Sequence, residues 1–220
     1  MEKLKKTLLL VMATTMAFFS MTSCLNDNDD NESTTSLSPE ETALYLRQMS
    51  GTAQGKTIMF YYAKSQQGLD SLAKDSVMNT SISITAADST ARMNFPMKLI
   101  AHNIENNEKL KAALEEMDDQ TLTARLLPYR TDQNDRLLGF YFLPQDGLST
   151  EVVYADGEKH KLKLSFSSNT IVDGYTFTCI GGYMPSTRAL SFYAMPYYLT
   201  IDEKSTITLK NNIMLFDGKN

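Results

Sequence analysis

The sequence predicts a mainly β domain with two short helices, built as an antiparallel β-sandwich or a partly closed β-barrel. Short runs rich in β-branched and aromatic residues recur from residue 56 onward. Only two segments of the domain carry a helical pattern. Strands do not alternate regularly with helices, which argues against a parallel α/β sheet. The spacing of the strands does not distinguish a sandwich from a barrel.

The first helix is expected at residues 39–50. Ser38 stands where an N-cap residue belongs, Pro39 fits the first helical turn, and Glu41 completes a capping box. Gly51 is expected to end this helix in a left-handed conformation, because glycine adopts positive φ without steric cost.

The strands are recognised by alternation and by turn residues between them. Asp156-Gly157 is a hairpin signal, and Leu162 and Leu164 alternate with lysines, so one face of that strand should be wet. Pro196 should interrupt the longest strand or hold it at an edge. The expected strands are 56–64, 78–85, 121–127, 137–143, 151–154, 159–166, 175–180, 189–201 and 206–209.

The second helix is expected at residues 106–117, NNEKLKAALEEM. Its residues are mostly good helix formers. An apolar stripe runs along one face at Leu110, Ala113, Leu114 and Met117.

Pairs and triplets of aromatic residues fall on four of the expected strands. Neighbouring strand residues point to opposite faces, so each group must send a ring outward or into a second layer. One interpretation is a tyrosine-lined surface or cavity for a sugar or lipid. We favour the other interpretation, a sandwich core with tyrosines at its rim and their hydroxyls in solvent. The groups are Phe60-Tyr61-Tyr62, Phe140-Tyr141-Phe142, Phe192-Tyr193 and Tyr197-Tyr198.

The sequence predicts neither a cofactor nor a metal site. His102 and His160 have no histidine or cysteine at ligand spacing, and His160 is expected among lysines on a solvated strand face. The acidic run from Asp27 fails the calcium-loop pattern, because Glu32 and Ser38 occupy the positions that need Gly and Glu. Cys179 lies in an apolar stretch and is interpreted as a small buried hydrophobe.

The N-terminus has the layout of a secretory signal peptide, expected at residues 1–23. MEKLKK is a short basic segment, and Thr7–Phe19 is an apolar stretch too short to span a bilayer. Met21-Thr22-Ser23-Cys24 resembles a bacterial lipobox. The resemblance implies cleavage before Cys24 and lipidation of its thiol. Two or three acyl chains would then give stable membrane anchoring.

The chain after Cys24 is expected to form a polar, flexible tether over residues 24–37. It is followed by a single mainly β domain over residues 38–220. The acids of the tether resemble the surface-export signal of Bacteroidetes-type lipoproteins, which follows the lipidated cysteine. The matching residues are Asp27, Asp29, Asp30 and Glu32.

Three short motifs resemble the Asp-Ser/Thr-hydrophobic signal for O-glycosylation in the same group of bacteria. They make Ser71, Ser76 and Ser89 candidate glycosylation sites. The whole chain is similar to small surface lipoproteins of these bacteria. Some of them have calycin-like (lipocalin-like) barrels, so the resemblance implies that fold as one option.

Charge and motifs then set the expected function. The formal net charge is −5, and the sequence lacks the lysine and arginine clusters that phosphate backbones require, so nucleic acid is not an expected partner. No catalytic motif is visible. We therefore expect a lipid-anchored protein of the outer membrane, facing outside the cell, that binds a small ligand or an envelope protein. The alternative is an extracellular hydrolase acting on a glycan or peptide.

Overall fold

The computed structural model describes residues 37–64, 70–131, 136–172, 175–209 and 212–220. The expected signal peptide, Cys24 and the acidic residues of the tether lie outside these ranges. The described part begins one residue before the N-cap of the first helix.

The chain folds into a closed antiparallel barrel of eight strands. Their order is β10-β5-β4-β3-β2-β1-β13-β11, and pairing between β10 and β11 closes the ring. The prediction of a mainly β fold is confirmed, and the barrel is the option that the structure adopts. The barrel strands are β1 (Gly51–Lys64), β2 (Asp70–Thr85), β3 (Thr90–Phe95), β4 (Gln120–Tyr129), β5 (Leu138–Pro144), β10 (Ile180–Met184), β11 (Ala189–Ile201) and β13 (Ile213–Lys219).

Strand β11 belongs to two sheets. Its first half, from Ala189 to Ala194, pairs with β13 inside the barrel. Its second half, from Met195, pairs with β7, and its last residues also pair with β12. A bulge between Pro196 and Tyr198 marks the change, which agrees with the expectation that Pro196 disturbs the strand. The outer strands are β6 (Leu148–Val153), β7 (Lys159–Ser167) and β12 (Ser205–Thr208), and β8 (Asn169–Val172) pairs with β9 (Tyr175–Thr178).

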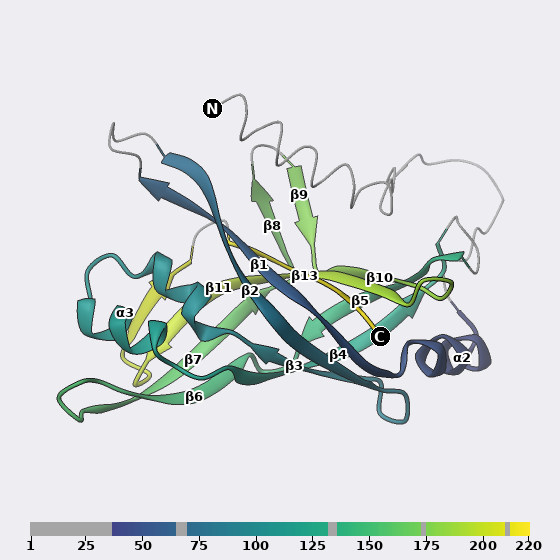
Figure 1. Cartoon of the computed structure of the whole chain (residues 1–220), viewed down its shortest axis with the longest axis horizontal. Coiled ribbons are helices and arrows are strands. Elements are labelled where there is room, and N and C mark those ends of the chain that lie inside the picture. The colour runs from purple at the N-terminus through teal and green to yellow at the C-terminus, as the bar shows by residue number, and fades with distance from the viewer. Residues whose placement is uncertain (1–36, 65–69, 132–135, 173–174, 210–211) are drawn as a thin grey trace.

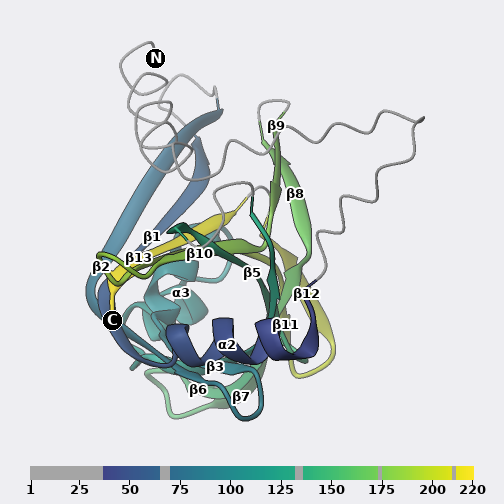
Figure 2. The same cartoon turned by 90° about the vertical axis from the view of Figure 1, so that its right-hand side faces the viewer.

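Three short helices cover the two ends of the barrel (Figures 1 and 2). Helix α2 (Pro39–Met49) lies across one end, and its N-terminus carries the predicted capping box between Ser38 and Glu41. The 3₁₀ helix η1 (Met97–Asn103) and helix α3 (Glu108–Glu115) pack together at the other end. Both predicted α-helices are confirmed within two residues at each end.

Phenylalanines fill the barrel. Phe192 is fully buried, and its ring centroid lies 4.1 Å from that of Phe142 and 5.2 Å from that of Phe216. The ring centroid of Phe140 lies 6.5 Å from that of Phe192. An eight-stranded barrel is just wide enough for side chains to fill its interior. These rings occupy the space that a ligand takes in a lipocalin.

A second apolar cluster lies on the outside of the barrel. The side chains inside and outside alternate along each strand. On β13, Met214 and Phe216 join the main core, whereas Ile213 and Leu215 join the outer cluster. Cys179 also belongs to the outer cluster, which agrees with its interpretation as a buried hydrophobe.

The sequence did not predict η1, β3, β8 or β13. The strand expected at 175–180 covers β9 but only the first residue of β10. Strand β13 begins IMLF and is buried on both faces, so it shows no alternation. Strand β3 does alternate, but its inward residues include Ala91, and alanine is a weak strand former. Gly51 directly follows the C-cap Ser50 with a positive φ of +132°, in agreement with the expectation that a glycine with positive φ ends the helix, and it also opens strand β1.

Candidate functional site

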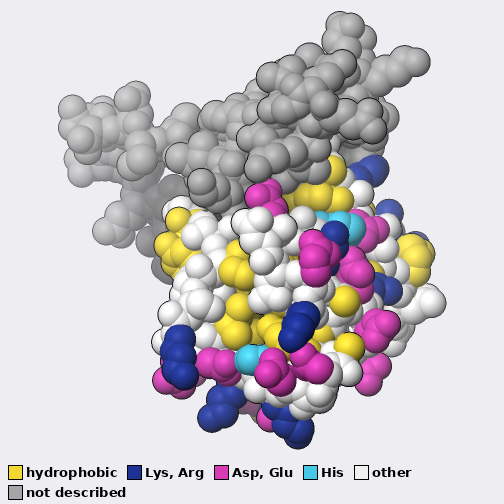
Figure 3. All heavy atoms as spheres, turned by 90° about the vertical axis from the view of Figure 1, so that its left-hand side faces the viewer, with side chains coloured by type: hydrophobic (Ala, Val, Ile, Leu, Met, Phe, Trp, Pro, Cys, Tyr) yellow, Lys and Arg dark blue, Asp and Glu magenta, His cyan; other side chains and the backbone are white. Residues whose placement is uncertain are grey.

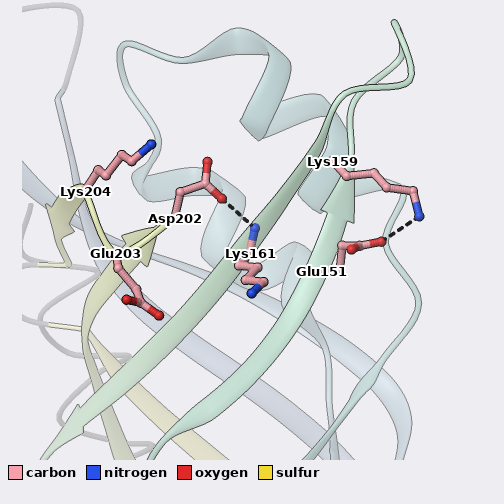
Figure 4. Close-up of a pocket in the computed structure, with 6 residues that line it drawn as sticks. All are labelled: Glu151, Lys159, Lys161, Asp202, Glu203 and Lys204. Carbon is pink, nitrogen blue, oxygen red and sulfur yellow. Dashed lines mark hydrogen bonds and ion pairs between the residues drawn. The ribbon is translucent and has the colours of Figure 1, made fainter.

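A charged hollow of about 420 Å³ lies where the outer sheet extends beyond the barrel (Figure 4). One side is formed by the paired strands β6 and β7, and the other by the turn from β11 to β12. Six charged side chains line it: Glu151, Lys159, Lys161, Asp202, Glu203 and Lys204.

The local sequence explains both walls of the hollow. Strands β6 and β7 form the predicted hairpin, and Gly157 in its turn has a φ of +88°. Asp202 and Glu203 both have positive φ, 50° and 59°, as the two central residues of a type I′ turn require, and the N–H of Lys204 donates to the C=O of Ile201 at 3.0 Å. This conformation is unfavourable for a side chain such as that of Glu203. The turn brings three charged residues together above strand β7.

Asp202 is held in place by two hydrogen bonds. Its Oδ2 lies 2.8 Å from Nδ1 of His160, and its Oδ1 accepts a bond of 2.9 Å from the backbone N–H of Lys161. The hydrogen bond from His160, together with the one from the Lys161 backbone, lowers the pKa of Asp202. Asp202 is therefore ionised and fixed at neutral pH.

His160 lies on the inner face of β7, and its expected position on the solvated face was wrong. Side chains alternate along β7, so His160 shares a face with the buried Leu162 and Leu164. His160 and Leu162 are two residues apart, so the sequence alone could have placed them on one face.

The ring centroid of His160 lies 4.3 Å from that of Tyr154. Its buried Nε2 has no hydrogen-bond partner in the described part of the chain. Oε2 of Glu158 lies 3.8 Å from this nitrogen.

The lysines of the hollow are not all neutralised. Lys159 donates a hydrogen bond of 2.9 Å to Glu151. Lys161 and Lys204 form no close ion pair with any residue that the structure describes. On the same outer face of β7, Lys163 has only Ser149 and Thr200 as its cross-strand neighbours. These ammonium groups are available for a carboxylate or sulfate group of a ligand.

The second histidine forms a similar arrangement elsewhere. Nε2 of His102 lies 2.8 Å from Oδ2 of Asp75, and the ring of Tyr61 stacks on the imidazole with centroids 4.8 Å apart. The pair joins η1 to β2. Burial of Asp75 opposes ionisation, but hydrogen bonds from His102 and the Ser76 backbone lower its pKa overall. In both pairs the described hydrogen bonds of the imidazole go to a carboxylate.

The aromatic groups divide between the core and its rim, as we favoured. Phe140 and Phe142 are buried, whereas Tyr141 between them is 41% exposed. Tyr197 and Tyr198 differ from the expected alternation. The bulge beside them leaves both rings exposed and 4.3 Å apart. Pro196 signalled a disturbance of this strand, but the exposure of both tyrosines depends on the strand pairing beside it.

A family model described as Domain of unknown function (DUF4840) matches residues 48–201. The match covers more than half of the chain, from the end of α2 to the end of β11. The chain belongs to this family. The DUF4840 match includes seven of the eight barrel strands and all strands of the hollow except β12. A search of curated proteins found no match.

The remaining predicted sites of this DUF4840 protein lie apart from the hollow. Ser76 is exposed on β2, and Ser89 is partly exposed in the turn before β3. Ser71 lies on β2, but its side chain is outside the described residues. Glycosylation at these positions stays a prediction.

Acidic and basic side chains are interleaved on the end of the molecule that Figure 3 shows. Within the described ranges, no group of three or more His, Cys, Asp or Glu side chains is placed to hold a metal ion. No helix in those ranges is long and apolar enough to cross a membrane.

Proposed function

We propose that this protein is a lipid-anchored lipoprotein of the outer membrane, displayed on the outside of the cell. Its barrel domain binds a ligand or an envelope protein at the charged hollow and catalyses no reaction. The anchoring part of the proposal rests on the lipobox-like Met21-Thr22-Ser23-Cys24. The acids that follow it support export to the surface, and the candidate O-glycosylation sites at Ser71, Ser76 and Ser89 fit the same location.

The filled barrel is the observation that supports an external binding site. Three stacked phenylalanines, Phe142, Phe192 and Phe216, occupy the interior. We therefore place the ligand on the outer surface, where the hollow offers concave shape and lysines without a close ion pair. Lys161 and Lys204 could each bind one anionic group, and the fixed carboxylate of Asp202 could accept a hydrogen bond from a hydroxyl.

The described side chains favour binding over catalysis. The imidazoles of His102 and His160 are each bonded to an aspartate, and the described hydrogen bonds place no serine or cysteine against either ring. Burial raises the pKa of the Cys179 thiol to about 11, so a thiolate is not available near neutral pH.

Anchoring is tested by replacing Cys24. Cells are fed an alkyne-tagged fatty acid, and the purified protein is examined for label. We expect Cys24→Ala to abolish labelling and to release the protein from membranes, whereas Cys179→Ala is the matched control and keeps its label. If Cys24→Ala is labelled as strongly as the native protein, the prediction that Cys24 is lipidated is wrong.

Surface display is tested by replacing the four acids Asp27, Asp29, Asp30 and Glu32 with alanine. We expect lipidation to continue. Protease added to whole cells should digest the native protein and spare the variant. If the native protein and the variant are digested equally, or if neither is digested, these acids do not direct export to the cell surface.

Binding at the hollow is tested with dextran sulfate as an anionic probe. We expect Lys161→Ala combined with Lys204→Ala to weaken binding by about tenfold, since each exposed ion pair contributes up to ~1 kcal/mol. Lys56→Ala combined with Lys219→Ala, on strands far from the hollow, is the matched control. Equal losses in both double variants would exclude the hollow as the anion site.

A further inference from the structure

Strand β6 leaves one edge of the outer sheet open. In the described sheet order β6 is the last strand, and its only ladder partner is β7. Figure 1 shows β6 along the margin of the molecule, with α3 beside the end that leads into the hairpin turn. An open edge presents unpaired backbone donors and acceptors, which is the surface to which another strand can add.

The backbone groups of Glu151 and Val153 face this open edge. The N–H of Tyr154 bonds to the C=O of Glu158 at the hairpin turn. Bonding alternates along an antiparallel pair, so Val152 and Thr150 also bond to β7, and the residues between them point their backbone groups away. No backbone hydrogen bond outside the ladders involves Glu151 or Val153 in the part of the chain that the structure describes.

A second hollow, of about 380 Å³, runs beside this edge. Helix α3 and the segment after it form its opposite wall through Ala113, Met117 and Gln120. Val153 contributes apolar surface at the edge and is 51% exposed. The hollow therefore combines an open strand edge with apolar contacts, which is what a docked peptide strand requires.

The charged side chains that line this hollow are all acidic. They are Glu116, Asp118 and Glu151. The last turn of α3 carries no basic residue, so the partial negative charge of the helix end adds to these carboxylates. Lys159 pairs with Glu151, whereas Glu116 and Asp118 form no close ion pair with any residue that the structure describes. The surface is complementary to a cationic segment.

We propose that the β6 edge binds an extended, lysine- or arginine-rich segment of a partner protein, which adds to β6 as an antiparallel strand. Backbone hydrogen bonds to Glu151 and Val153 hold the segment, and its cationic side chains pair with Glu116 and Asp118. A second copy of this chain does not fit as the occupant, because two β6 edges would bring like charges together. This site adjoins the charged hollow of the proposed function, because Glu151 lines both, but Glu116 and Asp118 line this second hollow alone.

The probe is a fluorescent peptide of three lysine–valine repeats, added to the full-length protein. We expect saturable binding that weakens with added salt. A peptide of glutamate–valine repeats should not bind. The lysine–valine peptide with N-methylated backbone at alternate residues should bind at least tenfold more weakly, because it cannot complete the ladder.

Two variants test the two halves of the site. Glu116→Gln combined with Asp118→Asn should weaken binding about tenfold. Glu40→Gln combined with Asp217→Asn is the matched control, because neither residue lines either hollow, and it should leave binding unchanged. Val153→Pro removes an outward N–H, which a strand edge tolerates, and should also weaken binding about tenfold. Circular dichroism checks that each variant keeps its β structure.

The possible results separate clearly. Loss of binding in Val153→Pro and with the N-methylated peptide supports strand addition. If the N-methylated peptide binds as tightly as the unmethylated one, the interaction is electrostatic and does not involve strand addition. That result would overturn the proposal. Absence of binding at millimolar peptide, or self-association of the protein through β6, would overturn it as well. None of these results depends on dextran sulfate binding at the other hollow.

Discussion

Replacement of Phe192 tests whether side chains fill the barrel interior. Phe192→Ala removes a fully buried ring that lies between those of Phe142, Phe216 and Phe140. Loss of the buried apolar surface costs about 2 kcal/mol. A residual cavity of about 100 Å³ adds ~2.4 kcal/mol at 24 cal/mol per Å³. The expected loss in the free energy of unfolding is therefore about 4 kcal/mol, a large share of the usual 5–15 kcal/mol.

The measurement is urea unfolding followed by far-UV circular dichroism, because the chain contains no tryptophan. The melting temperature should also fall by about 10 °C. Tyr198→Ala, at an exposed ring, is the control and should cost less than about 1 kcal/mol. A loss below about 1.5 kcal/mol for Phe192→Ala would refute the reasoning. It would mean that the ring of Phe192 borders a cavity, as in a lipocalin. The barrel interior would then be the candidate ligand site.

Three further predictions concern the helix cap and the charged hollow. Ser38→Ala should lower the free energy of unfolding by about 1 kcal/mol in urea titration, because it removes the acceptor of the Glu41 N–H, and no change would show that the cap does not matter. Glu203→Gly should raise the melting temperature through a gain of about 1 kcal/mol, since glycine adopts a φ of 59° without strain, and a decrease would contradict this. Asp202 has a lowered pKa, so it stabilises the fold above its ordinary pKa of 3.8 and loses this effect as the pH falls through its folded value. The stability difference between native protein and Asp202→Asn should therefore be largest at neutral pH and shrink in acid, and a constant difference across pH would refute the His160–Asp202 interaction.

Local chemistry explains which elements were predictable. Helix α2 was found because Ser38, Pro39 and Glu41 act within one turn, and the β6–β7 hairpin because Asp156-Gly157 specifies a turn. Strand β13 was missed because both of its faces are buried, and that depends on what packs outside the barrel. The choice of barrel over sandwich depends on the pairing of Gly181 with Phe192, residues that close the ring.

The candidate site was not predictable to the same degree. The lysines of β7 were correctly placed on the solvent-exposed face of the strand. The other residues of the hollow, Asp202, Glu203 and Lys204, come from a turn about 40 residues later in the chain. The same distance hid the contact between His160 and Asp202. Only the inner position of His160 could have been read from the sequence, through its parity with Leu162.

The sequence by itself determined the strand-rich composition, both α-helices, the hairpin turn and the expectation of a lipid anchor at Cys24, since each depends on residues close together in the chain. Tertiary structure alone decided that the barrel closes and that phenylalanines fill it. It also decided that Tyr197 and Tyr198 are both exposed and that β6 keeps an open edge beside α3. The physical reason is that strand pairing and burial are set by contacts between residues far apart in the chain, which a local pattern does not encode.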